Sequence, residues 1–229
     1  MKTYKNIKSV KALLFDFDGT LAKTMEDNYR GWFEVFKEYG IFLQRDDFFP
    51  LEGMKVQEIV VQIAQKYNLK DIDVDKAVKK KEEIFKRIHS FSLYHGVIEF
   101  LHSLKSDVLV AIVTAARRER IFSTTPKDFL DRFDVIISSD DLKRFKPYPD
   151  PYIEAMKMLD VSADECIVIE NAPLGIQSAK SAGIVCIAIA STMDTKYLQE
   201  ADKIIEKFSD LSSVEIIKEM VIEKGKYSQ

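Results

Sequence analysis

The sequence predicts an α/β protein with a doubly wound, Rossmann-like parallel sheet as its core and an inserted helical-bundle cap. Short apolar runs recur along the chain, and amphipathic helical stretches separate most of them. The runs are almost continuously hydrophobic, which is typical of parallel strands covered on both faces. More than ninety residues separate the first run from the second, far more than one crossover helix requires. Ligands of such sheets bind beyond the carboxyl ends of the strands, so we expect the functional site there.

The apolar runs give the predicted strands, and the long gap after the first run gives the predicted cap. The strands, in chain order, are Ala12–Phe15, Val108–Val113, Val135–Ile137, Cys166–Ile169 and Val185–Ile189. Within the gap, the spacing of apolar residues in Asn28–Tyr39, Val56–Ala64 and Val74–Ile88 predicts helices with one buried face.

The length fits one core domain with a smaller insertion. At 229 residues the chain exceeds one average domain and falls short of two. We assign residues 1–21 and 93–229 to an α/β core domain that contains the active site, and residues 22–92 to a helical cap domain. A chain of this length can bury roughly 70% of its unfolded surface, so folding requires neither disulfides nor a structural metal.

The charge balance and the hydropathy exclude several classes of partner. Lys and Arg (34) nearly balance Asp and Glu (37), for a net charge of −3, whereas nucleic-acid-binding proteins usually have a basic excess. No run approaches ~18 apolar residues, and Met1–Val10 lacks the apolar stretch of a signal peptide. We therefore expect a cytoplasmic monomer that binds neither nucleic acid nor membrane. Cys166 and Cys186 each lie within an apolar run and are expected to be buried core thiols.

Asp16 and Asp18 are the strongest functional signal in the chain. They follow the apolar run Ala12–Phe15 with one residue between them, and Gly19-Thr20 then turns the chain away. Two carboxylates so close repel each other, unless a cation lies between them or one keeps its proton. A nucleophile, a proton donor and a divalent ion are the groups that phosphoryl transfer needs. Taken alone, an Asp-x-Asp pair is more often an acidic turn after a strand than a functional pair.

The string Asp16-Phe17-Asp18-Gly19-Thr20-Leu21 resembles the first motif of the haloacid dehalogenase superfamily, in particular its β-phosphoglucomutase-like branch with a helical cap. The resemblance runs from Val10 to about Ile205. It implies that Asp16 attacks phosphorus and becomes an aspartyl phosphate, and that Asp18 protonates the leaving oxygen and later activates water. It also implies a Mg²⁺ cofactor with both aspartates among its ligands. Physical chemistry supports these roles, because a metal-bound carboxylate stays ionised while its neighbour can hold a proton near neutral pH.

Thr114 and Ala115 follow the predicted strand Val108–Val113, where a helix is expected to begin. A hydroxyl and free amides at such a place form a ready anion site, although Thr is also a good helix N-cap. The family has a phosphate-binding Ser or Thr here, and Thr114 matches it. Because Ala115 and Ala116 stand where relatives often have Ser or Asn, only their backbone amides can bind the phosphate. We interpret Arg117 as a solvated surface residue.

Lys146 lies in the rigid string Lys146-Pro147-Tyr148-Pro149-Asp150. A lone lysine in a loop is usually solvated, but this string resembles the family motif whose lysine neutralises the nucleophile and the phosphate. Lys146 is therefore both a catalytic and a substrate-binding candidate, a fixed cation beside the pentavalent phosphorus.

Glu170 and Asn171 follow the strand Cys166–Ile169 and complete the expected metal site with the two aspartates of the first motif. The family commonly has Glu-Asp here, with the Asp as a magnesium ligand. The amide oxygen of Asn171 can still bind a hard cation, but one negative charge is lost. Either the metal affinity is lower, or Glu170 takes a larger share, directly or through water. The alternative is that Asn171 only caps the helix that opens at Pro173.

Gly53 and Lys55 match the cap loop that reaches over the active site in relatives, and both are expected to contact the substrate. Lys55 could meet an anionic group of the substrate, although a solvated lysine at a helix start is the equal alternative. A cap lysine at this place also resembles phosphonoacetaldehyde hydrolase, but that relative has a small residue in place of Asp18.

Together these residues predict a Mg²⁺-dependent phosphatase that hydrolyses a small phosphorylated metabolite, such as a sugar phosphate, through an aspartyl phosphate. A phosphomutase of the β-phosphoglucomutase type is the alternative. Thr20 favours hydrolysis, and Lys23, Thr24 and Asn28 stand where mutases have other residues. Asp18 and the large cap argue against a signalling module that accepts phosphate without turnover. Haloacid dehalogenation is disfavoured, because those relatives lack the second aspartate and need no metal.

Overall fold

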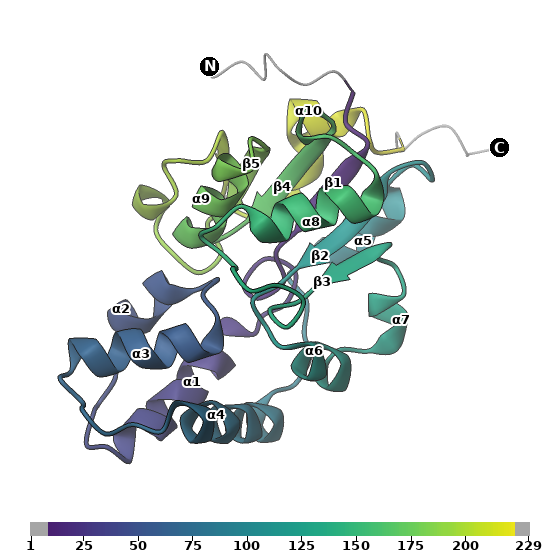
Figure 1. The fold of residues 1–229 in the computed structure, drawn as a ribbon. Coiled ribbons are helices and arrows are strands. Elements are labelled where there is room, and N and C mark those ends of the chain that lie inside the picture. The colour runs from purple at the N-terminus through teal and green to yellow at the C-terminus, as the bar shows by residue number, and fades with distance from the viewer. Residues whose placement is uncertain (1–8, 223–229) are drawn as a thin grey trace.

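A six-stranded, wholly parallel sheet forms the centre of the computed structural model, which describes residues 9–222 (Figure 1). The strand order is β3-β2-β1-β4-β5-β6. The strands are β1 (Ala12–Phe15), β2 (Leu109–Val113), β3 (Val135–Ile137), β4 (Cys166–Glu170), β5 (Val185–Ile189) and β6 (Lys203–Ile205). The predicted doubly wound α/β fold is confirmed. The edge strand β6 was not predicted, because only two of its residues, Ile204 and Ile205, are apolar, whereas all three residues of β3 are.

Helices flank the sheet and also form a separate group beside it (Figure 1). They are α1 (Met25–Lys37), α2 (Arg45–Phe48), α3 (Val56–Lys66), α4 (Val74–Ile88), α5 (Val97–Ser103), α6 (Arg118–Thr124), α7 (Lys127–Leu130), α8 (Asp150–Leu159), α9 (Pro173–Ser181) and α10 (Glu215–Lys218). The 3-10 helices are η1 (Phe49–Leu51), η2 (Ala163–Glu165), η3 (Thr195–Tyr197) and η4 (Phe208–Ser213). Among the described residues, no helix combines the length and the apolar character needed to cross a bilayer.

The sheet is covered on both faces, which explains the continuous hydrophobicity of its strands. Leu13 and Phe15 of β1 pack into a cluster with side chains of α5, α7 and η4. Ala12 and Leu14 point the other way and pack with side chains of α8 and α9. Every residue of β1 is fully buried. Both cysteines are buried and unpaired, as predicted.

Helices α1 to α4 with η1 form a second body beside the sheet, here called the helical lobe (residues 25–88; Figure 1). Its own hydrophobic cluster includes Trp32, Phe36 and Val60. Two connecting segments join it to the sheet and run antiparallel to each other. Ala22 forms an antiparallel bridge with Leu93, and the backbone N–H of Lys23 donates to the carbonyl of Ser92 at 2.9 Å. The N- and C-terminal ends of the predicted core domain, residues 1–8 and 223–229, lie outside the described residues, as does most of Met1–Val10.

Strand β1 lies at the point where the strand order reverses. Phe15, its last residue, pairs with Ile112 of β2 on one side and with Ile169 of β4 on the other. The residues that follow these three strands therefore meet at one edge of the sheet, which is where open α/β sheets bind ligands.

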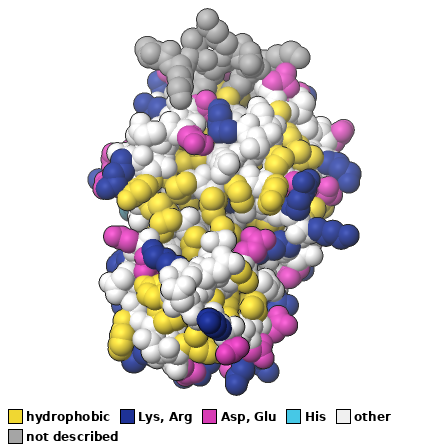
Figure 2. Space-filling view, turned by 60° about the vertical axis from the view of Figure 1, so that its left-hand side comes forward, with side chains coloured by type: hydrophobic (Ala, Val, Ile, Leu, Met, Phe, Trp, Pro, Cys, Tyr) yellow, Lys and Arg dark blue, Asp and Glu magenta, His cyan; other side chains and the backbone are white. Residues whose placement is uncertain are grey.

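The outer surface carries charges of both signs. On the face drawn in Figure 2, Lys and Arg side chains are interspersed with Asp and Glu, and hydrophobic side chains lie among them. This distribution agrees with the near-balance of charge in the sequence.

Candidate active site

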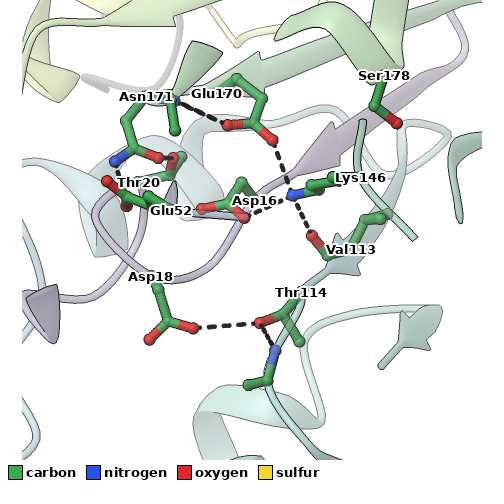
Figure 3. Close-up of polar contacts among 12 residues, drawn as sticks. Asp16, Asp18, Thr20, Glu52, Val113, Thr114, Lys146, Glu170, Asn171 and Ser178 are labelled. Atoms are coloured by element: carbon green, nitrogen blue, oxygen red, sulfur yellow. Dashed lines mark hydrogen bonds and ion pairs between the residues drawn. The ribbon is translucent and has the colours of Figure 1, made fainter. Parts of the chain in front are cut away.

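Asp16 and Lys146 form the centre of the site (Figure 3). Asp16 directly follows β1, and Lys146 comes from the loop before α8. The Lys146 Nζ atom lies 2.6 Å from Asp16 Oδ1, 2.8 Å from Glu170 Oε1 and 2.9 Å from the carbonyl oxygen of Val113. The Lys146 side chain is fully buried. The structure thus places a fixed cation against the expected nucleophile.

Asp16 and Lys146 shift each other's pKa, and one oxygen of Asp16 is left without a hydrogen-bond partner among residues 9–222. Burial raises the pKa of Asp16, while the charge of Lys146 opposes that rise. Burial disfavours the charged form of Lys146, but Asp16 and Glu170 raise the pKa of Lys146, so its ammonium stays charged. Asp16 Oδ2 is buried and has no hydrogen-bond partner among residues 9–222. A buried oxygen without a partner is costly and indicates that a ligand completes the site.

Asp18 has a very different environment. Its Oδ1 accepts hydrogen bonds from Thr24 at 2.5 Å and from Arg120 Nη1 at 3.0 Å, and its Oδ2 accepts from Arg120 Nη2 and from Thr114 at 3.3 Å. Burial works against ionisation, but the charge and hydrogen bonds of Arg120 lower the pKa of Asp18 to about 2. In this arrangement Asp18 is ionised, contrary to the expectation that it holds a proton near neutral pH.

Arg120 is a residue that the sequence analysis missed. It lies in the first turn of α6 and its side chain is 4% exposed. Its guanidinium forms a two-pronged contact with Asp18 and lies 4.9 Å from the ring centre of Phe85 in α4. Arg117, three residues earlier, has a side chain that is 41% exposed and pairs with Asp140. The available signal was the position of Arg120 one helical turn after Arg117, on the inward face of a helix beside the expected phosphate loop.

Thr114 and Ala115 lie where the sequence predicted them. The Thr114 hydroxyl accepts a hydrogen bond from the backbone N–H of Ala116 at 3.1 Å and donates to Asp18. The following helix begins at Arg118, so Thr114 is not its N-cap. The turn that Thr114 stabilises holds the residues after β2 close to Asp18.

Glu170 and Asn171, at the end of β4, both use their side chains within the protein (Figure 3). Besides Lys146, Glu170 accepts hydrogen bonds from the Tyr152 hydroxyl at 2.7 Å and from the Asn171 N–H at 3.0 Å. Asn171 Oδ1 accepts from Thr20 at 2.9 Å. The N-cap of α9 is Ala172 and the helix has no side-chain cap, so the alternative that Asn171 caps this helix is wrong.

Glu52, from the helical lobe, is the second residue that the sequence analysis missed. Asn171 Nδ2 donates to Glu52 Oε1 at 2.6 Å, and Thr192 donates to Glu52 Oε2 at 3.2 Å. Burial raises the pKa of Glu52 well above its usual value, and the charges of Asp16, Glu170 and Asp18 add to the rise. Gly19 makes this approach possible, since its φ is +86° and a Cβ there would overlap Glu52 Oε1 and Asn171 Nδ2.

Gly53 lies beside the catalytic centre, whereas the side chain of Lys55 binds elsewhere in the protein. Gly53 lies over Lys146, since a Cβ on it would come within 3.4 Å of Lys146 Cδ. Lys55 Nζ instead donates to the carbonyl oxygen of Leu142 at 2.5 Å and so joins the helical lobe to the loop after β3. In this arrangement Gly53 is close to the catalytic centre, and the ammonium of Lys55 is engaged by the protein.

The oxygen atoms around Asp16 fit a hard divalent cation with few protein ligands. Within residues 9–222, no three His, Cys, Asp or Glu side chains are grouped as a ready-made metal site. Among residues 9–222, Asp16 Oδ2 has no hydrogen-bond partner, and the side-chain oxygen Oδ1 of Asn171 has a second lone pair beyond its bond from Thr20. Glu52 adds a nearby carboxylate. Mg²⁺ is commonly held by one or two carboxylates with substrate phosphate and water, which suits this donor set.

Comparisons with known proteins identify the family of the chain. The haloacid dehalogenase-like hydrolase family matches residues 13–189. The chain belongs to this family. The predictions of the family and of an enzyme are confirmed.

Named relatives include proteins of quite different length. A validoxylamine A 7'-phosphate phosphatase of Streptomyces hygroscopicus subsp. limoneus is 30% identical over 203 residues, which cover 88% of this chain and 95% of that protein. The protein SUPPRESSOR OF QUENCHING 1 of Arabidopsis thaliana is 32% identical over 199 residues, 84% of this chain but only 19% of that protein. Among solved structures, a putative β-phosphoglucomutase from Bacteroides vulgatus superposes with a TM-score of 0.81 at 26% identity, covering 95% of this chain and 92% of that one.

Proposed function

We propose that this haloacid dehalogenase-like hydrolase is a Mg²⁺-dependent phosphatase that hydrolyses a small phosphorylated metabolite through an aspartyl phosphate on Asp16. The observation that carries the proposal is the buried Asp16–Lys146 contact of 2.6 Å, with the second oxygen of Asp16 left without a partner. A carboxylate held by a fixed cation at the carboxyl edge of a parallel sheet is suited to attack a phosphoryl group.

In the first step, an oxygen of Asp16 attacks phosphorus while the bond from phosphorus to the ester oxygen breaks. Lys146, fixed by Glu170 and by the Val113 carbonyl, offsets the charge of the nucleophile and of the phosphoryl oxygens. The leaving oxygen needs a proton, which the proposal assigns to Asp18. In the second step water attacks the aspartyl phosphate, and Asp18 takes the proton from that water.

Asp18 cannot donate a proton while Arg120 holds both of its oxygens, because that contact keeps the carboxylate ionised. The proposed cycle therefore includes a rearrangement in which Asp18 leaves Arg120, takes up a proton from solvent before the lobe closes, and turns to the leaving oxygen. Phe85 of α4 packs against Arg120, so a movement of the helical lobe would affect the contact between Arg120 and Asp18. We propose that the lobe acts as a cap, opening for exchange and closing to exclude water.

Asp16 and Asn171 are the residues proposed to hold Mg²⁺, with Glu52 contributing charge from the cap. The ion would supply charge neutralisation for the phosphoryl oxygens and for Asp16. Asp18 and Glu170 were also predicted as ligands, but their side-chain oxygens already accept hydrogen bonds from Arg120 and Lys146. We propose instead that Asp18 positions the guanidinium of Arg120 and that Glu170 positions the ammonium of Lys146.

The alternative is a phosphomutase, supported by the likeness to a putative β-phosphoglucomutase. Incubation with hexose phosphates separates the two, because a phosphatase releases free phosphate and a mutase yields isomerised sugar phosphate. A screen of sugar phosphates, nucleotides and p-nitrophenyl phosphate, with Mg²⁺ or with a chelator, tests the main proposal. Trapping during turnover should place the phosphoryl group on Asp16. A label on another residue, or full activity in the chelator, would contradict the proposal.

A further inference from the structure

Two buried cations line the cavity between the helical lobe and the sheet. The cavity has a volume of about 40 Å³, and its walls include Asp18, Lys81, Ala115 and Arg120. Arg120 comes from α6 of the core and Lys81 from α4 of the lobe. Only 4% of the Arg120 side chain and 2% of the Lys81 side chain are exposed. Buried cations are strongly unfavourable without anionic partners, so the partners of these two groups define what the cavity can bind.

Each cation has an anionic partner in this structure, but the partner of Arg120 is also a reacting group. Lys81 Nζ lies 3.0 Å from Glu82 Oε1 and donates to Asn28 Oδ1 at 2.6 Å. Neither of these acceptors has a part in the proposed reaction. The anionic partner of Arg120 is Asp18, which uses both oxygens to accept from the guanidinium.

The reaction takes this partner away from Arg120. When Asp18 turns toward the leaving oxygen of a substrate, at least one of its oxygens can no longer face the guanidinium. Arg120 is closed off from bulk water by Phe85, whose ring centre lies 4.9 Å away. Among residues 9–222, the guanidinium donates its hydrogen bonds to Asp18, and the nearby Glu82 acts on it through its charge alone. An anionic group of the substrate that enters the cavity beside Arg120 would replace the hydrogen bonds that Asp18 gives up.

We infer that Arg120, with Lys81 beside it, binds a second anionic group carried by the leaving group of the substrate. This inference rests on the proposed function and specifies its substrate class: a small phosphomonoester whose leaving group has a carboxylate or a second phosphate near the ester oxygen. The guanidinium suits either group, since its planar donors match carboxylate and phosphate oxygens in pairs.

The size of the cavity restricts the leaving group further. By the measure in which one water molecule needs ~10–15 Å³, a cavity of about 40 Å³ has room for a few water molecules. With the lobe closed as seen, the space beside Asp18 therefore holds a group of a few non-hydrogen atoms and no sugar ring. The second anionic group is therefore expected within a few bonds of the phosphoester.

A matched set of three esters tests this inference by binding. The ligands are 2-phosphoglycolate, the bisphosphate of ethylene glycol and 2-hydroxyethyl phosphate, which share a two-carbon unit and end in a carboxylate, a phosphate or a neutral hydroxyl. Calorimetric titration uses the full chain with Asp16→Asn, in MgCl₂, so that binding is measured without turnover. At least one anionic ester should bind about 10- to 100-fold more tightly than the hydroxyethyl ester. Which of the two binds more tightly identifies the source of the second charge.

Variants of Arg120 in the same background connect the preference to this residue. Arg120→Gln should bring the ratio of affinities close to one, and Arg120→Lys, which keeps the charge without the paired donors, should leave an intermediate ratio. Arg118→Gln, at an exposed arginine of the same helix, should leave the ratio unchanged. If Arg120→Gln does not fold by circular dichroism, the lysine variant decides the question.

Equal affinity for all three esters would overturn the inference, as would a preference that survives unchanged in both Arg120 variants. Failure of the proposed function is a separate outcome. If the protein with Asp16 intact hydrolyses none of the three esters while the affinity ratio and its dependence on Arg120 hold, the anion site stands and the phosphatase proposal falls.

Discussion

At the scale of single residues, the two aspartates of the first motif differ in the cation that each one faces. Asp16 shares Lys146 with Glu170 and keeps one oxygen without a partner. Asp18 receives both prongs of Arg120. A single lysine contact leaves a carboxylate free to attack, whereas a paired guanidinium contact holds it in place. The division of roles proposed for the two acids follows from this difference.

Asp16→Asn is expected to reduce turnover of p-nitrophenyl phosphate by about 10⁴-fold or more while the fold is kept, because the amide is a poor nucleophile and nearly the same shape. Phosphate release and circular dichroism measure the two effects. Asp107→Asn, at an exposed aspartate, is the control and should keep activity. Appreciable turnover by the folded Asp16 variant would refute the assignment of the nucleophile.

The Asp18–Arg120 contact predicts a specific dependence of stability on acid. The pKa of Asp18 is lowered from 3.8 to about 2, so its contribution is complete above pH 4 and is lost as the pH falls toward 2. That loss amounts to about 2 kcal/mol of the free energy of unfolding. At pH 7, Asp18→Asn should destabilise the protein by about 3–5 kcal/mol, since Arg120 is left buried without its partner.

Urea unfolding of wild type and Asp18→Asn at a series of pH values from 7 down to 3 measures this dependence. The difference in the free energy of unfolding between the two proteins should shrink at the acid end. A difference that stays constant, or grows, as the pH falls would mean that Arg120 does not hold the pKa of Asp18 down.

At the scale of elements, the local sequence pattern was enough to predict those features that depend on residues close together in the sequence. Strands β1 to β5 were found because each is a run of apolar residues buried on both faces. The motif residues of the site were found because each directly follows one of these strands or lies in a recognisable loop. The ends of helices were less accurate, since α1 begins at Met25, three residues before the predicted start.

Arg120 and Glu52 could not be found in this way, because their role depends on contacts between distant segments. Arg120 reaches a residue 102 positions away, and Glu52 meets Asn171 across 119 positions. A lone arginine in a helix and a lone glutamate in a loop are ordinary surface residues by sequence. Only the packing of the helical lobe against the sheet buries them beside reactive groups.

Glu52, directly after η1, is buried near three other acids. Glu52→Gln is therefore expected to change the melting temperature differently with and without metal. Glutamine can still accept from Asn171, and it removes the cost of burying an acid whose pKa is raised by burial and by Asp16, Glu170 and Asp18. In a chelator the melting temperature should rise by about 2–4 °C, as expected for ~1 kcal/mol in a protein of this size. With Mg²⁺, the variant should gain less than wild type, because it binds the ion more weakly.

Thermal unfolding in EDTA and in a MgCl₂ series measures both effects. Glu58→Gln, on the exposed side of α3, is the matched control and should follow wild type in both conditions. If Glu52→Gln melts lower in EDTA, or gains as much from Mg²⁺ as wild type, the carboxylate has another role than the one proposed.

At the scale of the whole molecule, the helical lobe and the sheet touch on both sides of the site and are joined by two short connections. Glu52 and Lys55 contact the core on one side, and Phe85 and Lys86 of α4 contact α6 on the other. The cavity of about 40 Å³ that remains is too small for a ring-sized leaving group while these contacts persist. Turnover by the proposed mechanism therefore requires the two bodies to separate and close again.

A covalent link across this boundary should stop turnover. Lys86 of the lobe and Glu119 of the core form an exposed ion pair of 2.7 Å and are suitable sites for cysteines. A short bismaleimide should join Lys86→Cys to Glu119→Cys, while the buried Cys166 and Cys186 stay unmodified. The linked protein is expected to lose about tenfold or more of its turnover of p-nitrophenyl phosphate. The single variant Lys86→Cys, treated with the same reagent, should keep its activity. A longer bismaleimide should restore part of the turnover, because it lets the lobe and the core separate while they stay linked. Full activity with the short link would show that substrate reaches Asp16 without any opening of the lobe.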